Sequence, residues 1–247
     1  MPRFLLLALC AVVLAACADA QSPTSSADAT VLVVDGREAN GTASDPTGWD
    51  ASPALQEAMR DARQHWATAD PNYEEETRVL AVAEGAFTRP GVRERAALYL
   101  MALWPRCCPK LGLAVIGADD RLVQNVAFEG SFQGVQTVPD LDEDGLDELV
   151  LTGTFGMGGD VTGSAVLASF RPEGLVGRGA VETFQSGCAA SRPSESSVKV
   201  MARLGTPGFT AERFTRPCDS ATWTSEGSPE PVLFEGTGGT FTVLPVR

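Results

Sequence analysis

The hydrophobic pattern of residues 111–247 is the feature that most constrains the fold. Apolar residues recur there with a period of about two, and LGLAVIGADDRLVQNVAFEG predicts two strands joined by a turn at Ala118–Asp120. DELVLTGTFGMGGDVTGSAVLASFRPEGL predicts two longer strands joined through a glycine-rich turn, and shorter strands follow as far as GTFTVLPV. Short connections of this kind join antiparallel neighbours. We therefore expect residues 111–247 to form an antiparallel β-rich part.

The preceding residues 31–110 show a helical period instead. SPALQEAMRDARQHW begins with Ser52 as a cap and Pro53 in the first turn, and it places four apolar residues on one face: Leu55, Met59, Ala62 and Trp66. RPGVRERAALYLMALW, at residues 89–104, predicts a second helix, whereas TRVLAVAEGAF fits either a short strand or a helix. The predicted fold is therefore α+β, with a helical N-terminal part packed on a mostly antiparallel β-sheet.

The chain opens with an export signal. MPRFLLLALCAVVLAAC has one positive charge at Arg3, then an apolar run too short to span a bilayer as a helix, then small residues. Its end, LAAC, resembles the lipobox of bacterial lipoproteins, which implies a signal peptide at residues 1–16 and an acylated Cys17. By the same resemblance, Ala18 implies the outer membrane where the organism has one. The alternative is an ordinary signal peptide cleaved near Ala18 or Ala20, with loss of Cys17.

Composition limits the partners. Residues 17–30 are small and polar, so we expect a flexible tether there. The net charge of −13 repels nucleic acid and anionic lipid headgroups, so we expect no nucleic-acid partner and membrane contact through the N-terminal lipid alone. The expected location is the cell envelope, lipid-anchored, on the outer membrane facing the periplasm or the exterior.

Four cysteines remain after the signal and the acylated residue, an even number that suits an oxidising compartment and predicts two disulfides. Adjacent cysteines pair only through a strained ring, so Cys107 and Cys108 are expected to reach separate partners or to stay partly reduced. The sequence between Cys188 and Cys218 contains two predicted strands about a Gly-Pro-Gly turn, and such a hairpin brings these two sulfurs close. Crossed pairings remain the alternative.

The strongest signal for a binding site is DLDEDGLDE at residues 140–148, where acids stand at alternate positions and a glycine follows. Calcium takes about six to eight oxygen ligands, and a loop that turns at glycine supplies them from positions one, three, five and nine and from the carbonyl at seven. The expected ligands are Asp140, Asp142, Asp144, the Leu146 carbonyl and Glu148. A solvated acidic turn is the alternative interpretation.

This loop is similar to that of a known family. An EF-hand would need a glutamate at the twelfth position and a following helix, but Leu151 stands there within a β-rich run. The stretch at residues 138–155 instead resembles the calcium loop of FG-GAP or integrin-type propeller repeats, DxDxDGxxD followed by a strand. The resemblance implies the same five ligands, with Glu148 in place of the usual aspartate. Only the loop is carried over, because a propeller needs several such repeats and the sequence contains one.

No catalytic signature emerges from the sequence. The one histidine, His65, provides no evident Ser-His-Asp or Cys-His arrangement. An SxxK stretch at Ser196–Lys199 lacks its SDN and KTG companions. GTFGMGGDVTG lacks the GK[ST] of a phosphate loop and is followed by a strand pattern. Whether the chain is an enzyme is left open, with a binding role favoured.

Three functions are compatible with these features. The first is a lipid-anchored envelope protein with a calcium-stabilised β-rich domain, which binds or scaffolds an envelope protein or a glycan. The second is an envelope hydrolase that uses paired carboxylates. The third is a calcium-dependent adhesion or glycan-binding module, in which the cation or its loop contacts the partner.

Overall fold

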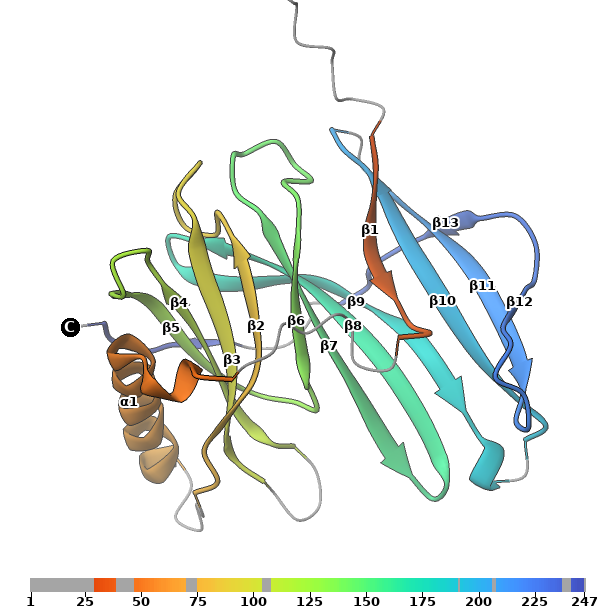
Figure 1. The fold of residues 1–247 in the computed structure, drawn as a ribbon, viewed down its shortest axis with the longest axis horizontal. Helices are drawn as coiled ribbons and strands as arrows, with labels where there is room; N and C mark the ends of the chain where they lie inside the picture. Colours follow the sequence, from red (N-terminus) through yellow and green to blue (C-terminus); the bar gives the residue numbers. More distant parts are fainter. Residues whose placement is uncertain are drawn as a thin grey trace, which may run out of the picture.

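The computed structural model describes residues 29–38, 47–69, 75–103, 108–190, 192–205, 208–236 and 241–246 (Figure 1). Within these ranges the chain forms one α-helix and fourteen strands, which are arranged in two antiparallel sheets. The predicted signal peptide, most of the predicted tether, Cys17 and Cys107 lie outside the described residues. No helix of the described part is long and apolar enough to cross a membrane.

The smaller sheet has five strands in the order β14-β5-β4-β3-β2. The strands are β2 (Arg78–Gly85), β3 (Glu94–Ala102), β4 (Lys110–Ile116), β5 (Leu122–Glu129) and β14 (Thr242–Val243). The turn predicted at Ala118–Asp120 joins β4 to β5, and Asp120 adopts a φ of 55° there, in the left-handed region that tight turns require. The prediction of a hairpin in this segment is confirmed.

The helix α1 (Pro53–Ala69) packs on one face of the smaller sheet. Its predicted cap is confirmed, because the Ser52 hydroxyl accepts a hydrogen bond from the Leu55 N–H at 3.3 Å. The apolar residues expected on one face of this helix are all buried against the sheet: Leu55, Met59, Ala62 and Trp66.

The second predicted helix is wrong, because this segment forms strand β3. Ala97, Tyr99 and Met101 face α1, whereas the alternate residues 96, 98 and 100 face the larger sheet. A strand that is buried on both faces reads as a continuous apolar run and loses the alternation that marks a strand in sequence. The α+β fold class is wrong for the same reason: the chain is mainly β, a sandwich of two antiparallel sheets with a single described helix.

The larger sheet follows the order β12-β11-β10-β9-β8-β7-β6, and β1 and β13 pair with β10 and β11 respectively. Its strands are β1 (Thr30–Asp35), β6 (Gly134–Val138), β7 (Glu148–Met157), β8 (Asp160–Arg171), β9 (Gly174–Ser186), β10 (Ser194–Arg203), β11 (Phe209–Pro217), β12 (Thr224–Ser225) and β13 (Glu230–Val232). The glycine-rich turn between β7 and β8 is confirmed. Gly158 and Gly159 have φ values of 63° and 93°, as a two-residue hairpin turn of this hand requires.

The larger sheet curls, and the face that it turns away from the smaller sheet becomes concave and encloses a second core. Strand β9 pairs with β10 only near Ser197, and β1 pairs with the remainder of β10. Strand β1 therefore lies between β10 and β6 (Figure 1), and the Gln136 amide of β6 donates to the Val33 carbonyl of β1. Buried residues of β1, β7, β8 and β10 fill the concave side of this curl: Val33, Val34, Val150, Leu167, Val198 and Val200.

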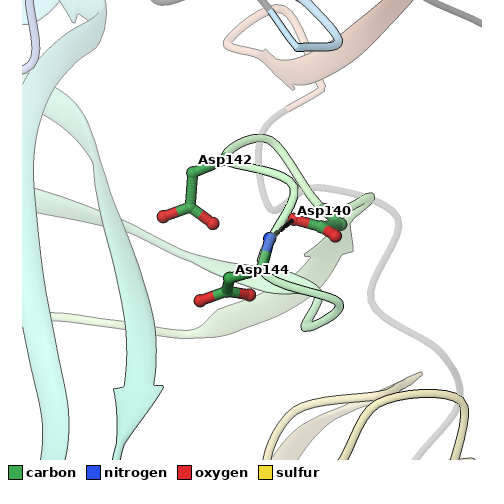
Figure 2. Close-up of side chains that lie close together, drawn as sticks. All are labelled: Asp140, Asp142 and Asp144. Atoms are coloured by element: carbon green, nitrogen blue, oxygen red, sulfur yellow. Dashed lines mark hydrogen bonds between the residues drawn. The ribbon is translucent and has the colours of Figure 1, made fainter.

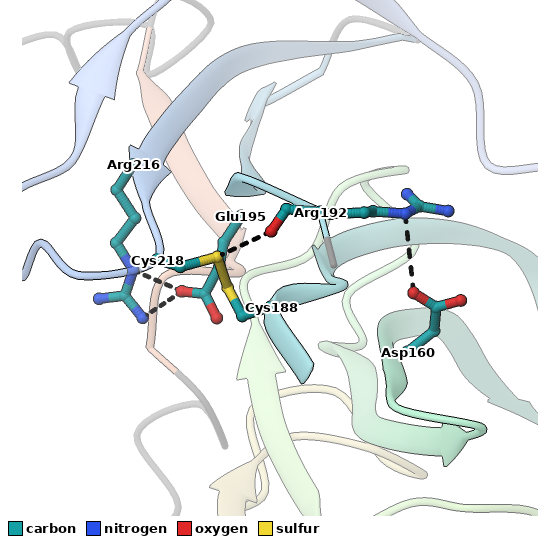
Figure 3. Close-up of a disulfide and its surroundings, with 6 residues drawn as sticks. All are labelled: Asp160, Cys188, Arg192, Glu195, Arg216 and Cys218. Atoms are coloured by element: carbon teal, nitrogen blue, oxygen red, sulfur yellow. Dashed lines mark hydrogen bonds and ion pairs between the residues drawn. A yellow bond between two sulfur atoms is a disulfide. The ribbon is translucent and has the colours of Figure 1, made fainter. Parts of the chain in front are cut away.

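The disulfide predicted between Cys188 and Cys218 is confirmed (Figure 3). Cys188 lies just after β9 and Cys218 just after β11, so the disulfide closes the β10–β11 hairpin as expected. The crossed pairings are thereby excluded. Cys108 is also disulfide-bonded.

Candidate metal centre

The acidic loop connects β6 to β7, and the pair Val138–Glu148 closes it at the base. Each of Asp140, Asp142 and Asp144 offers a carboxylate oxygen within 4.8 Å of the others (Figure 2). The structure thus brings together three of the residues that the sequence predicted as ligands. The group could hold a metal ion, and nothing in its geometry selects calcium.

Backbone hydrogen bonds shape the loop around Asp140. Its carboxylate accepts from the Asp144 N–H at 3.1 Å and from the Gly145 N–H at 2.7 Å. The Asp144 carboxylate accepts in turn from the Leu146 N–H at 2.9 Å. Glu143 and Gly145 both adopt positive φ, 59° and 88°, so the loop reverses direction at the predicted glycine.

Two arginines of the β8–β9 hairpin contact the acidic loop, and the sequence interpretation did not include them. Arg171 donates to Asp144 and, at 2.9 Å, to Asp142. Arg178 donates to the same Asp142 oxygen, Oδ2, at 2.7 Å. Burial acts to raise the pKa of Asp144, but hydrogen bonds from Arg171 and from the loop backbone outweigh it and lower the pKa below its usual value. No local sequence signal links these arginines to a loop some thirty residues earlier.

Glu148 lies apart from the three aspartates, as the buried first residue of β7 with a relative exposure of 1%. Its carboxylate accepts from the Leu141 N–H at 2.8 Å, from Arg178 at 3.1 Å and from the Ser169 hydroxyl at 3.3 Å. Burial is the main cause that raises the pKa of Glu148 to about 7, against the opposing effects of Leu141 and Arg178. Arg178 is therefore the bridge between Glu148 and Asp142.

The other acids of the stretch serve the fold. Asp147 accepts a hydrogen bond from the Ala86 N–H at 2.8 Å, and its own N–H donates to the Ala86 carbonyl at 2.8 Å. These bonds attach the loop to the segment after β2. Leu146 stands between Asp144 and Asp147 in the loop, half-buried. The six acids of the stretch thus divide into three converging aspartates, one buried glutamate, one anchoring aspartate and the exposed Glu143.

The donor set suits a hard cation, since it consists of carboxylate oxygens without a sulfur or imidazole ligand. In the structure two guanidinium groups balance part of this charge, at Asp142 and Asp144. A bound cation would therefore take over contacts that Arg171 and Arg178 now make.

In comparisons with known proteins, no family model, no curated protein and no solved structure matches the chain.

Proposed function

We propose that the chain is a lipid-anchored cell-envelope protein whose β-rich domain holds one Ca²⁺ ion in loop 140–148, and that it acts by binding or scaffolding. The observation that carries the calcium proposal is the convergence of Asp140, Asp142 and Asp144. The export signal and the lipobox-like LAAC support the location.

In this proposal the cation screens carboxylates that would otherwise repel one another. Asp140, Asp142 and Asp144 supply the first oxygens, and the Leu146 carbonyl and Glu148 complete the set. Arg171 and Arg178 leave Asp142 and remain beside the loop as its outer charges. Since β6 and β7 pair directly below the loop, holding its ends together stabilises this edge of the larger sheet.

The arrangement favours a binding role over paired-carboxylate hydrolysis. The carboxylates of Asp140, Asp142, Asp144 and Glu148 all accept hydrogen bonds from arginines or from loop amides. Glu148, whose pKa is raised, is almost completely buried behind the loop. A general acid must reach its substrate within hydrogen-bond distance, which this position opposes.

A melting experiment tests the calcium proposal. An affinity on the order of 10⁻⁴ to 10⁻⁶ M is expected for ligands drawn mainly from one extracytoplasmic loop. At a hundredfold excess over the dissociation constant, calcium should stabilise the folded state by about 2.7 kcal/mol relative to chelator. Asp142→Ala should remove most of that gain, and Mg²⁺ should substitute poorly because it demands stricter octahedral geometry.

Asp219→Ala is the matched control, because it removes an exposed aspartate away from the loop and should keep the full calcium gain. If the wild-type protein melts at the same temperature with calcium and with chelator, the loop is a solvated acidic turn and the calcium proposal fails.

A further inference from the structure

A cleft lies on the concave side of the curled sheet, at the opposite end of the β7–β8 hairpin from the acidic loop. It has a volume of about 310 Å³, and its lining includes the end of β1 and residues of β7, β8 and β9. This volume is within the range of about 300–1,000 Å³ typical of small-molecule sites. None of its lining residues belongs to the acidic loop.

Glycines leave the space open. Gly163 of β8 puts no side chain into the cleft, where a Cβ would lie 2.8 Å from the Phe184 Cβ and 3.2 Å from the Thr183 hydroxyl oxygen. At Gly36 a Cβ would lie 1.9 Å from the Thr183 carbonyl oxygen, so only glycine lets the end of β1 approach β9 this closely. Glycine residues therefore shape this cleft, because they let the backbones of β1 and β9 approach and leave the space between them without side chains.

Several hydroxyl groups line the cleft, and two of them make no hydrogen bond to the part of the chain that the structure describes. Thr152 and Thr183 are 7% and 5% exposed, and neither side chain makes a hydrogen bond to any described residue. Thr154 and Ser164 add two half-buried hydroxyls to the same lining. The hydroxyl oxygens of Thr152 and Thr183 are not among the fully buried, unpartnered side-chain atoms of the described residues, so they remain accessible from the cleft. These hydroxyls leave donors and acceptors for a bound molecule.

Both arginines that line the cleft are paired with carboxylates, and the exposed Glu38 adds a negative charge to the lining. Arg37 donates to Asp35 at 2.8 Å, and Arg216 donates to Glu195 at 2.5 Å, next to the disulfide (Figure 3). Each guanidinium is also stacked: Arg37 lies 3.9 Å from the Phe214 ring centre and Arg216 lies 4.4 Å from that of Trp223. Because these positive charges are already balanced, the cleft does not favour phosphate or another anion.

An aromatic wall completes the cleft. Phe184 and Trp223 meet edge to face with ring centres 6.4 Å apart, and both side chains are half-buried. The C–H faces of a sugar ring pack on aromatic rings, and its hydroxyls both donate and accept hydrogen bonds, as threonine and serine hydroxyls do. We propose that this cleft binds one or two rings of a neutral saccharide, independently of calcium.

The proposal is tested on the protein isolated in the form that the cell makes, by saturation-transfer NMR and calorimetry. The probes are glucose, galactose, mannose, N-acetylglucosamine, maltose, cellobiose and chitobiose. We expect at least one of them to bind with a dissociation constant of about 1 mM or tighter. Thr183→Val and Trp223→Ala should each weaken that binding about tenfold, a loss of about 1.4 kcal/mol. Chelator should change it by less than about twofold, since the acidic loop is not part of the cleft.

Thr162→Val is the matched control, because Thr162 adjoins Gly163 on β8 but does not line the cleft. It should bind like the wild type. Thr183→Val should also melt no lower than the wild type, because the Thr183 hydroxyl makes no hydrogen bond to a described residue. The proposal is overturned if no probe binds at about 10 mM, tenfold above the expected constant. It is also overturned if both cleft variants bind like the wild type, or if inorganic phosphate binds in preference to every sugar.

Discussion

Two guanidinium groups meet on a single carboxylate oxygen of the acidic loop. Asp142 Oδ2 accepts from Arg171 at 2.9 Å and from Arg178 at 2.7 Å, and both arginine side chains are about two-thirds buried or more. A cation that binds this same oxygen must displace them, so the arginines compete with calcium for it. The same contacts hold the loop together when no cation is bound.

Removing one of these arginines should therefore have opposite effects on affinity and stability. Arg171→Gln should tighten calcium binding about tenfold, since one unit of competing charge is lost within a few ångströms of the ligands. In chelator it should lower the free energy of unfolding by about 1 kcal/mol, the upper value for a partly exposed ion pair. Calorimetric titration and denaturant unfolding measure the two effects.

The control is Arg60→Gln, on the polar side of α1 and remote from the loop, which should leave calcium affinity unchanged. Weaker calcium binding by Arg171→Gln would mean that the arginine organises the ligands instead of competing with the cation.

Glu148 gives the calcium-free protein a distinctive pH dependence. Its folded pKa of about 7 lies above the ordinary value of 4.5, so the folded state holds this proton more tightly than the unfolded state. The contribution of this group to the free energy of unfolding is present in full below about pH 4.5. It is lost as pH rises through about 7, and the free energy of unfolding falls by up to about 3 kcal/mol. In chelator, denaturant unfolding at several pH values should show this fall for the wild type, and Glu148→Gln should flatten it. An equal slope in both proteins would contradict the assignment to Glu148.

Among the elements, β3 is joined to β5 and to the helix α1 by one buried polar network. The Tyr99 hydroxyl donates to the Asn125 side chain at 2.7 Å, and the Asn125 amide donates to the Ala58 carbonyl of α1 at 2.9 Å. Tyr99 pairs with Gly112 of β4, and a Cβ at Gly112 would lie 2.2 Å from the tyrosine ring. The ring therefore lies over a position where only glycine fits.

Gly112→Ala should be strongly destabilising for this reason. The added methyl group must move a fully buried ring and disturb its hydrogen bonds, which we expect to cost about 3 kcal/mol or more. Gly156→Ala on β7 is the matched control, because its Cβ would have no neighbour closer than 3.7 Å. Denaturant unfolding compares the two variants. A similar small loss in both would show that Tyr99 can shift without cost.

At the scale of the whole molecule, β1 ties the N-terminal segment to the outer side of the sandwich. It begins at Thr30, where the predicted tether 17–30 ends, and it pairs with β10. An acyl group on Cys17 would thus place the domain close to a membrane, joined by a short polar segment. Several acyl chains anchor firmly, since each buried methylene contributes about 0.8 kcal/mol and one chain alone is marginal.

Labelling tests this anchor. Wild-type protein produced with labelled palmitate should carry the label and fractionate with membranes, whereas Cys17→Ala should lose the label and be released or misprocessed. An unlabelled wild-type protein would leave the ordinary signal peptide as the correct interpretation.

Several features of this protein could be predicted from local sequence patterns alone. The helix α1 and its Ser52 cap, the turns after β4 and β7, the hairpin that joins Cys188 to Cys218, and the grouping of three aspartates all depend on residues near one another in the chain. Spacing is informative there because a turn or a helical face is set by neighbouring residues.

Tertiary structure decided the rest. Strand β3 is apolar on both faces because α1 covers one face and the larger sheet covers the other. Its sequence alone is therefore compatible with a helix, and only the positions of α1 and the larger sheet show that it is a strand. The guanidinium groups of Arg171 and Arg178 reach the acidic loop because β8 and β9 lie beside β7. The hydroxyl-lined cleft exists because the larger sheet curls until β1 meets β9 at Gly36. In each case the contacts join residues that are far apart in sequence. Their stabilising energy is gained only when the sheets assemble, so local sequence patterns do not reveal it.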